Sequence, residues 1–279
     1  MNSNDFIHST RYFIKKYLPM FKKAPVKYGT YADANYACLG YGYENEMLVD
    51  VVFKKTLNYK NEINSNLSLM AAEGSLQSMI GILLAQLEPN KKKTVNVIDL
   101  GGACGAHYFH MRAALGNRMI IKWHVVETPV MVNKAKLLET DELRFFDDIT
   151  VAKDAFKSDV NYFHSSGAIQ YFTDPDNTLK EIFNSQAQFI MLGRLALSLG
   201  RQEVITIQES MLSANGPGPL PVGVQDRLCK YPVIYYPKQK LEELIREKYS
   251  IVLKFPESTI NIIEDQTIIT TGYLAKRLV

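Results

Sequence analysis

The residues best suited to chemistry lie in one glycine-rich segment, residues 95–105. An apolar stretch there ends in Asp99, and the glycines Gly101, Gly102 and Gly105 follow it directly. Glycines let a backbone approach a ligand closely, and the first turn of a helix that follows offers unpaired N–H donors. The segment therefore predicts a site for a nucleotide-like ligand.

The acid and the glycine spacing narrow the kind of nucleotide. A dinucleotide site uses Gly-x-Gly-x-x-Gly to receive a pyrophosphate, whereas here Asp99 precedes Gly-Gly-Ala-Cys-Gly. A carboxylate at this position repels a pyrophosphate and suits the ammonium of a phosphate-free nucleoside such as S-adenosylmethionine. Glu127 ends the next apolar stretch, where a carboxylate can accept both ribose hydroxyls. Two strand-end acids that only cap helices are the alternative interpretation.

Alternating strands and helices are expected to position these residues. The strand candidates are residues 95–100, 120–127, 143–146, 160–165, 189–192, 251–255 and 267–275. The helix candidates are residues 106–115, 130–140, 177–184 and 238–248. This pattern predicts an α/β fold with a doubly wound, mostly parallel, Rossmann-like sheet that closes with an antiparallel pair. In such sheets ligands bind at the carboxyl ends of the strands.

The chain before this pattern is expected to be a helical cap. We expect the cap at residues 1–92 and the nucleotide-binding domain at residues 93–279. The helices expected in the cap cover residues 6–21, 44–57 and 65–87. The stretch 28–43 is predicted to be irregular and to gate a pocket, and the glycine- and proline-rich loop 213–223 is predicted to close over it. The helix at 6–21 has a basic face, which suits either a solvated cap or an anionic membrane surface; the cap is the favoured interpretation.

Composition limits the classes of protein that fit. The 279 residues are 47% hydrophobic and 22% charged with a net charge of +3, which predicts a packed core and no dedicated nucleic-acid surface. The three cysteines, Cys38, Cys104 and Cys229, are widely spaced, which favours a reduced cytoplasmic protein. We see neither a secretory signal nor an apolar stretch of the ~20 residues that a membrane-spanning helix needs.

The sequence predicts no catalytic metal. The histidines His107, His110 and His124 lack ligand spacing with nearby acids or cysteines. Solvated or packed roles are expected for all three.

The turn at residues 99–105, Asp-x-Gly-x-Ala-x-Gly, resembles the first motif of class I S-adenosylmethionine-dependent methyltransferases, with Ala103 in place of the usual central glycine. More narrowly, the chain is similar to a bacterial family of methyltransferase-like proteins with no settled substrate. The resemblance runs from about residue 40 to the C-terminus. The matching stretches are residues 101–109, 123–129, 143–147, 165–171 and 231–232. It implies a seven-stranded class I sheet, S-adenosylmethionine as cofactor and S-adenosylhomocysteine as product.

The resemblance also implies roles for single residues. In class I enzymes the residues after the third strand meet the adenine, so Asp147 or Asp148 is expected to bind the adenine amino group and Ile149 to pack on the ring. An exposed acidic turn is the alternative for these residues. The residues expected to bind the cofactor are Asp99, Gly101, Gly102, Gly105, Glu127, Thr128, Asp147, Asp148, Ile149, Ser165 and Ser166.

Methyl transfer is an in-line displacement, for which alignment supplies most of the catalysis. His164, at the end of the fourth strand, is the candidate base for a hydroxyl or amine acceptor, with a packed histidine as the alternative. Arg194 is expected to hold an anionic group of the substrate, or else to form a structural salt bridge. Tyr171 completes the predicted catalytic set. The residues expected to contact the acceptor are Tyr108, Gln170 and Gln208. For Gln208, burial against the backbone is the favoured alternative, and Gln170 and Tyr171 could instead complete the pocket wall.

The sequence thus predicts a methyltransferase that acts on oxygen or nitrogen of a small-molecule or sugar-like acceptor. We expect no nucleic-acid partner and no stable membrane association, and homodimerisation is left open. One alternative is an NAD-dependent oxidoreductase on the same fold, which the missing Gly-x-Gly-x-x-Gly disfavours. The others are a catalytically silent nucleotide-binding protein and a membrane-surface protein led by the helix at 6–21.

Overall fold

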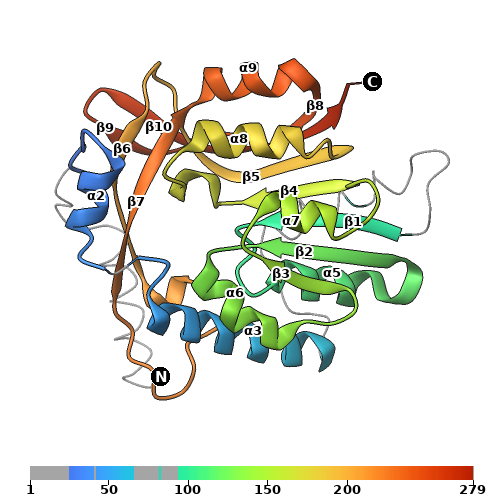
Figure 1. The fold of residues 1–279 in the computed structure, drawn as a ribbon. Helices are drawn as coiled ribbons and strands as arrows, with labels where there is room; N and C mark the ends of the chain where they lie inside the picture. Colours follow the sequence, from blue (N-terminus) through green and yellow to red (C-terminus); the bar gives the residue numbers. More distant parts are fainter. Residues whose placement is uncertain (1–24, 41, 66–81, 83–93, 279) are drawn as a thin grey trace, which may run out of the picture.

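The structure is a computed structural model that describes residues 25–40, 42–65, 82 and 94–278 (Figure 1). The predicted helix at 6–21 and almost all of the predicted helix at 65–87 lie outside the described residues. These two helices, and the boundary between residues 1–92 and 93–279, stay predictions. Of the helices in the described ranges, none is long and apolar enough to cross a membrane.

A ten-stranded sheet forms the centre of the molecule. Its main path consists, in order, of β3 (Leu143–Phe146), β2 (Ile120–Val126), β1 (Thr94–Leu100), β4 (Tyr162–Ser166), β5 (Phe189–Ser198), β10 (Gln266–Arg277) and β8 (Tyr249–Lys254). The first five strands of this path pair in parallel, and β10 runs antiparallel to both β5 and β8. The prediction of a doubly wound, mostly parallel sheet is confirmed, although the sheet has ten strands where seven were predicted.

Three more strands extend the sheet beyond the prediction. They are β6 (Val204–Met211), β7 (Leu228–Pro237) and β9 (Ser258–Ile263). β7 pairs briefly in parallel with the end of β5 and along its length with β6, while β9 pairs with the first half of β10. In Figure 1 the strands β1–β5 point toward the side of the molecule where β7 and α2 (Tyr31–Ala37) lie. The carboxyl ends of the parallel strands therefore face this additional layer.

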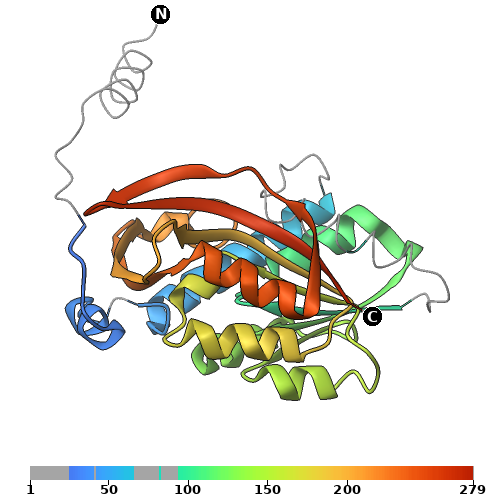
Figure 2. The same cartoon turned by 90° about the horizontal axis from the view of Figure 1, so that it is seen from above.

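Helices cover both faces of the sheet (Figure 2). One face carries α3 (Glu46–Ser65), α5 (Ala106–Leu115) and α6 (Pro129–Ala135), and the other carries α7 (Ile149–Asp154), α8 (Pro175–Asn184) and α9 (Lys238–Lys248). The 3₁₀ turns are η1 (Gly116–Arg118), η2 (Lys136–Leu138), η3 (Ile169–Tyr171) and η4 (Leu212–Ala214). Each face has its own cluster of buried apolar side chains, as expected for a sheet buried on both sides.

The alternation of side chains along β1 explains where its acid lies. Val95 and Val97 belong to the cluster under α5, and Ile98 and Leu100 to the cluster under α7 and α8. Because successive side chains of a strand point to opposite faces, Asp99 falls on the α5 face with the two valines. This carboxylate is fully buried, so it requires polar partners there.

The helix boundaries differ from the predictions in several places: the helix predicted at 130–140 is α6 followed by η2, and the helix predicted at 177–184 begins at Pro175. α3 continues to Ser65 instead of ending near residue 57, and α2 forms inside the stretch 28–43 that was predicted to be irregular. α7 was not predicted at all. Both α2 and α7 begin at a side-chain cap, because Thr30 and Asp148 accept hydrogen bonds from backbone N–H groups of the first helical turn.

Candidate functional site

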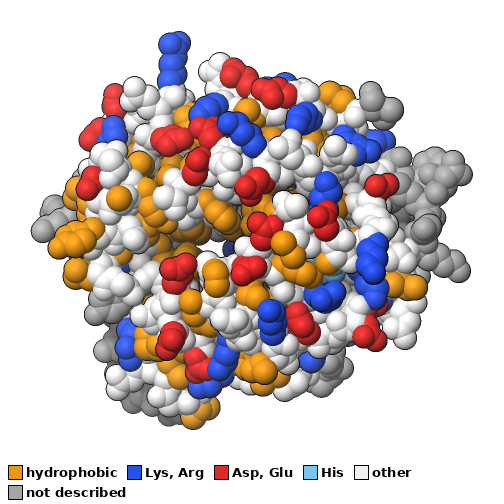
Figure 3. All heavy atoms as spheres, viewed as in Figure 1, with side chains coloured by type: hydrophobic (Ala, Val, Ile, Leu, Met, Phe, Trp, Pro, Cys, Tyr) orange, Lys and Arg blue, Asp and Glu red, His pale blue; other side chains and the backbone are white. Residues whose placement is uncertain are grey.

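The glycine turn joins the end of β1 to the start of α5. Gly101 has φ 73°, a left-handed conformation that favours glycine, and a Cβ there would overlap the Cβ of Ala168. Its N–H donates to the carbonyl of Val126 at 2.9 Å, which fastens the turn to the end of β2. Figure 3, drawn in the same view as Figure 1, shows a hollow at the centre of the molecule. It lies over the carboxyl ends of β1, β2 and β4 and has hydrophobic and acidic side chains at its rim.

Glu127 follows the last residue of β2 and bridges the turn to the next helix. Its Oε1 accepts from the N–H of Ala103 at 3.0 Å, and its Oε2 accepts from the N–H of Thr128 at 2.9 Å. Burial raises the pKa of Glu127, and the negative charge of Asp99 raises it further. The two backbone hydrogen bonds lower it, but by less than burial and Asp99 together raise it. Each carboxylate oxygen has a second lone pair, so this half-buried acid can accept two hydroxyl donors while it holds the turn.

Asp99 lies beneath the turn, away from its open side. Its Oδ1 accepts from Nδ1 of His164 at 2.7 Å and its Oδ2 from Nε1 of Trp123 at 3.1 Å. Nδ1 of His107 is 3.7 Å from Oδ2. Burial alone would raise the pKa of Asp99, but His164 and His107 outweigh it and hold the pKa below its usual range. The predicted contact with a cofactor ammonium disagrees with this geometry, because the carboxylate is buried and serves protein donors.

His164 is also buried without exposed surface. Burial lowers its pKa, opposed by Asp99, so the imidazole is neutral near pH 7 and donates its Nδ1–H to the carboxylate. A side chain with no exposed surface cannot take a proton from an acceptor. The predicted role of His164 as the base is therefore wrong for this arrangement, and the packed interpretation describes it.

Asp99, His107 and His164 come together as a set that could ligate a metal, with one potential ligand atom each and all three atoms within 4.8 Å of one another. The spacing along the chain did not suggest this grouping, because the two histidines come from α5 and β4. The Trp123 and His164 N–H groups already satisfy the carboxylate. A hydrogen-bonded network accounts for the cluster, and the predicted lack of a metal stays a prediction.

The residues expected around the adenine fall into two groups. Asp148 caps α7 by accepting from the N–H of Val151 at 2.8 Å, and Asp147 beside it is exposed. Ile149 packs into the core cluster under α7 with little exposed surface. Asp147 and Asp148 are both exposed, but Asp148 has a structural partner as the cap of α7 and Ile149 is buried, so Asp147 is the one of the three left for a ligand.

Arg194 and the end of β4 form the other side of the site. The Nε–H of Arg194 donates to Oγ of Ser166 at 2.9 Å, and its Nη2–H donates to the carbonyl of Ser166 at 3.0 Å. Two neighbouring polar atoms, Oγ of Ser165 and Oε1 of Gln170, are buried with no hydrogen-bond partner. Buried polar atoms are rarely left unpaired, and of these two residues Gln170 keeps some exposed surface, so its Oε1 is the one within reach of a ligand.

Three tyrosines line the approach to this region. Tyr43 stacks on Tyr231 with ring centroids 4.1 Å apart, and Tyr171 meets both rings edge-on. The Tyr171 hydroxyl donates to Oε1 of Gln208 at 2.9 Å, so these two predicted residues do come together. The Glu127 carboxylate is among the groups that raise the pKa of Tyr43, after burial, so Tyr43 lies near the end of β2 as well.

Sequence reasoning gave no specific role to Tyr43 or Tyr231. The signal for Tyr231 was its place in the stretch 231–232 that carries the resemblance, and the signal for Tyr43 was the tyrosine-rich composition of residues 28–43. Neither signal says that the two rings touch.

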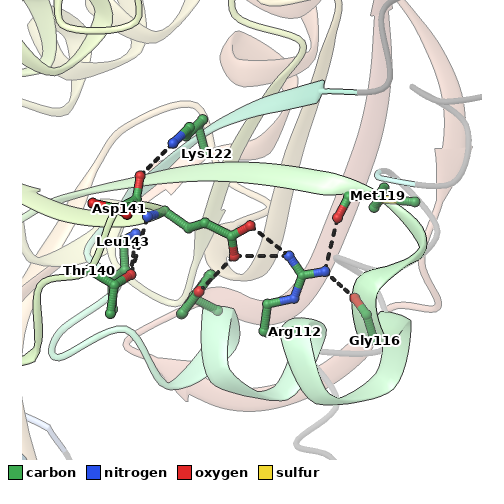
Figure 4. Close-up of polar contacts among 9 residues, drawn as sticks. Arg112, Gly116, Met119, Lys122, Thr140, Asp141 and Leu143 are labelled. Atoms are coloured by element: carbon green, nitrogen blue, oxygen red, sulfur yellow. Dashed lines mark hydrogen bonds and ion pairs between the residues drawn. The ribbon is translucent and has the colours of Figure 1, made fainter.

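Tyr108 lies away from the site, contrary to its predicted contact with the acceptor. Its hydroxyl donates to Oε2 of Glu142 at 2.9 Å, directly before β3 begins. Arg112 binds both oxygens of the same carboxylate, and it also donates to the carbonyls of Gly116 and Met119 (Figure 4). The side chain therefore points toward the amino end of β3, whereas the glycine turn lies at the carboxyl ends of the strands.

The strand order 3-2-1-4-5 is that of a Rossmann-like sheet, and the antiparallel β10 beside β5 completes the class I methyltransferase fold that the resemblance implies. No family model matches the chain, and no curated protein matches it either.

Solved structures with a similar chain path include proteins that are named as methyltransferases. The N-terminal domain of EvdMO1 with S-adenosylhomocysteine bound has 9% identity over 75% of this chain and 83% of its own, at TM-score 0.44. A proposed S-adenosylmethionine-dependent methyltransferase of Listeria monocytogenes has 15% identity over 75% of this chain and 100% of its own, at TM-score 0.43. The carbon methyltransferase of CurJ has 11% identity over 74% of this chain and 54% of its own, at TM-score 0.44.

Proposed function

We propose that this protein is an S-adenosylmethionine-dependent methyltransferase. The observation that carries the proposal is the position of Glu127: its carboxylate stands at the end of β2, fixed by the N–H groups of Ala103 and Thr128, beside the glycine turn. A carboxylate placed there suits the two hydroxyls of a ribose. The turn offers close backbone approach without a basic side chain of its own, which suits a nucleoside without phosphates.

The described residues divide into a cofactor side and an acceptor side. Glu127, the turn and exposed Asp147 would hold the nucleoside. When bound, S-adenosylmethionine supplies an electrophilic methyl group that an oxygen or nitrogen atom of the acceptor can attack. Tyr171, with a raised pKa caused first by burial, stays protonated near neutral pH and orients the acceptor with Gln208. Alignment by these groups supplies the catalysis.

Asp99 enters this proposal as a positioning residue. Its carboxylate underlies the turn, where a Cβ on Gly102 would overlap it. The turn can therefore fold over the acid only with glycine at that position. Because Asp99 is shielded in this way, it does not by itself exclude a pyrophosphate, and the test of function includes NAD.

The proposal is tested by calorimetry with S-adenosylmethionine, S-adenosylhomocysteine and NAD. We expect the first two to bind near ~1 μM, about −8 kcal/mol, and Glu127→Gln to weaken both by about tenfold or more, because a charged acceptor becomes a neutral one. Glu243→Gln, an exposed change on α9, is the matched control and should change nothing. Preferential binding of NAD, or equal binding by the Glu127 variant, contradicts the proposal.

Partners and location belong to the same proposal. We propose a small-molecule acceptor, methylated on oxygen or nitrogen, with no nucleic-acid partner and no stable membrane association. The three buried cysteines form no disulfide, which supports a reducing compartment such as the cytoplasm. Size-exclusion chromatography with light scattering tests whether the protein forms a homodimer.

A further inference from the structure

We propose that Arg194 is the receptor for an anionic group of the methyl acceptor, and that the acceptor is a small organic anion that also carries a hydroxyl or amine donor. This inference rests on the proposed function, because an acceptor site presupposes a methyl donor beside it. It names the class of substrate, which the fold alone leaves open.

The backbone places Arg194 by a bulge in β5. Leu192 pairs with Tyr273 and Leu195 pairs with Thr271, so Gly193 and Arg194 together oppose Gly272 alone. Arg194 has φ 49°, a left-handed conformation that costs a side-chain-bearing residue about 1–2 kcal/mol. Bulges redirect side chains and occur beside active sites. This one turns the Arg194 side chain toward the end of β4, where it reaches Ser166.

The guanidinium is held by one of its two hydrogen-bonding edges. Nε–H and one Nη2–H bind Oγ and the carbonyl oxygen of Ser166. The five N–H groups of an arginine form a rigid fork, so the end-on edge made by Nη1 and Nη2 remains for a second partner. In the part of the chain that the structure describes, no carboxylate lies within ion-pair distance of this exposed guanidinium. A fixed, exposed fork suits a carboxylate or phosphate, which it can bind through two parallel bonds.

The groups around Arg194 specify the rest of the ligand. The positive charge of Arg194 lowers the pKa of Tyr171, and the side chains of Gln170 and Gln208 form hydrogen bonds with the Tyr171 hydroxyl. The four side chains therefore face one region. Oε1 of Gln170 is a buried acceptor without a donor. It calls for a hydroxyl or amine on the ligand, at a short distance from the anionic group. The stacked rings of Tyr43 and Tyr231 add an apolar wall that suits a planar or ring-shaped ligand.

Arg194 could bind either the carboxylate in the amino-acid part of the cofactor or an anionic group of the acceptor. The order of the strands distinguishes these two sources of the anion. The glycine turn follows β1, β4 lies next to β1, and β5 lies beyond β4. Arg194 sits on β5, so it is two strands away from the turn, on the side of Tyr171 and Gln208. This placement favours the acceptor as the source of the anion.

The test uses two probes that differ in charge only at one substituent. Binding of 4-hydroxybenzoate and of the neutral 4-hydroxybenzyl alcohol is measured by ligand-detected NMR, with S-adenosylhomocysteine bound to the wild-type protein. We expect the anion to bind about tenfold tighter than the alcohol, since a charge-assisted pair contributes about 1.5 kcal/mol or more. Arg194→Gln should abolish that preference and Arg194→Lys should keep part of it. Arg246→Gln, which removes an equal charge from α9, should keep all of it.

A second arm separates the cofactor from the acceptor. The affinities of S-adenosylhomocysteine and 5′-methylthioadenosine, which lacks the amino-acid carboxylate, are compared in wild type and Arg194→Gln. We expect both affinities to be unchanged, which also shows that the variant is folded. A selective loss of S-adenosylhomocysteine overturns the inference, as does equal binding of the two phenol probes, no binding of the anion, or a charge preference that survives the substitution. If wild type fails to bind S-adenosylhomocysteine, the proposed function itself has failed.

Discussion

Two acids that look equivalent in the sequence have different tasks because of where each stands relative to its strand. Asp99 is inside β1 and is paired in register with His164 of β4, so its side chain enters the interior of the sheet. Glu127 comes just after Val126, the last residue of β2, where the chain has left the sheet. A shift of two positions along a strand thus separates a buried acid that supports the turn from one that can meet a ligand.

The pH dependence of cofactor binding should report the state of Glu127. Burial raises its pKa above the ordinary value of 4.5, and only the ionised carboxylate can accept two hydroxyl donors. The affinity for S-adenosylhomocysteine should therefore fall as the pH falls through this raised pKa, at a higher pH than for an ordinary glutamate. Calorimetry across the acidic range checks this. Glu127→Gln should bind weakly at every pH, and a variant that kept the same pH profile would refute the assignment.

The buried network around Asp99 predicts a loss of stability with little loss of binding. In Asp99→Asn the amide nitrogen must face either Trp123, whose Nε1–H then loses its acceptor, or His164, whose ring must then change tautomer to accept at Nδ1. We expect about 1–3 kcal/mol lower free energy of unfolding, measured by urea denaturation. Affinity for S-adenosylhomocysteine, measured well below the melting temperature, should change only a few-fold. A complete loss of binding by a folded variant would restore the direct contact with the ammonium that the sequence suggested.

At the scale of elements, helices and strands could be predicted where apolar residues recur at a regular spacing. The elements that were missed lack such a spacing. The bounds of β3, α5 and α9 were predicted as they are; α5 lies between Gly105 and Gly116, and α9 begins directly after Pro237. α7 has only six residues, too few for a helical repeat to appear. β7 contains Pro232, which indicates against a strand, but Pro232 pairs with Ile207 of β6 in the structure.

The loop after β6 depends on a buried lysine of α3. Nζ of Lys55 donates to the carbonyl of Ser213 at 2.7 Å and to the carbonyl of Asn215 at 2.6 Å. Lys55→Met keeps the length of the side chain and leaves both carbonyls without this donor, so we expect a loss of about 1–3 kcal/mol and faster proteolysis within residues 213–223. Lys54→Met, at an exposed surface pair, is the control and should cost well under 1 kcal/mol. Equal protease resistance in both variants would show that the contact does not hold the loop.

At the scale of the whole molecule, the candidate site brings together segments that are far apart in the chain. Tyr43 precedes α3, Tyr171 ends η3, Gln208 belongs to β6 and Tyr231 to β7, yet their side chains form one group. The glycine turn could be found from the sequence because its residues are contiguous. The tyrosine cluster could not, since it depends on β7 pairing with β6 and with the last two residues of β5, and no spacing along the chain encodes that contact.

The stability of the whole molecule should fall in mild acid, and His124 should account for part of the loss. Its ring stacks on Phe156 at 3.7 Å and Nδ1 donates to the carbonyl of Ala152 at 2.7 Å. The pKa of His124 is lowered to about 4: burial is the main cause, the charges of Arg144 and Lys122 add to it, and the Ala152 hydrogen bond opposes it.

His124 is protonated near pH 6.5 in the unfolded chain but only near pH 4 in the folded chain. Its contribution to stability is therefore complete above pH 6.5 and is lost as the pH falls toward 4. We expect His124 to contribute about 2 kcal/mol of lost stability between about pH 7.5 and about pH 5, measured by urea denaturation. His124→Phe keeps the ring stack and removes the titrating group, so its stability should depend less steeply on pH. The buried His164 should leave a residual slope of the same sign. An unchanged slope in His124→Phe would mean that the histidine is protonated in the folded protein.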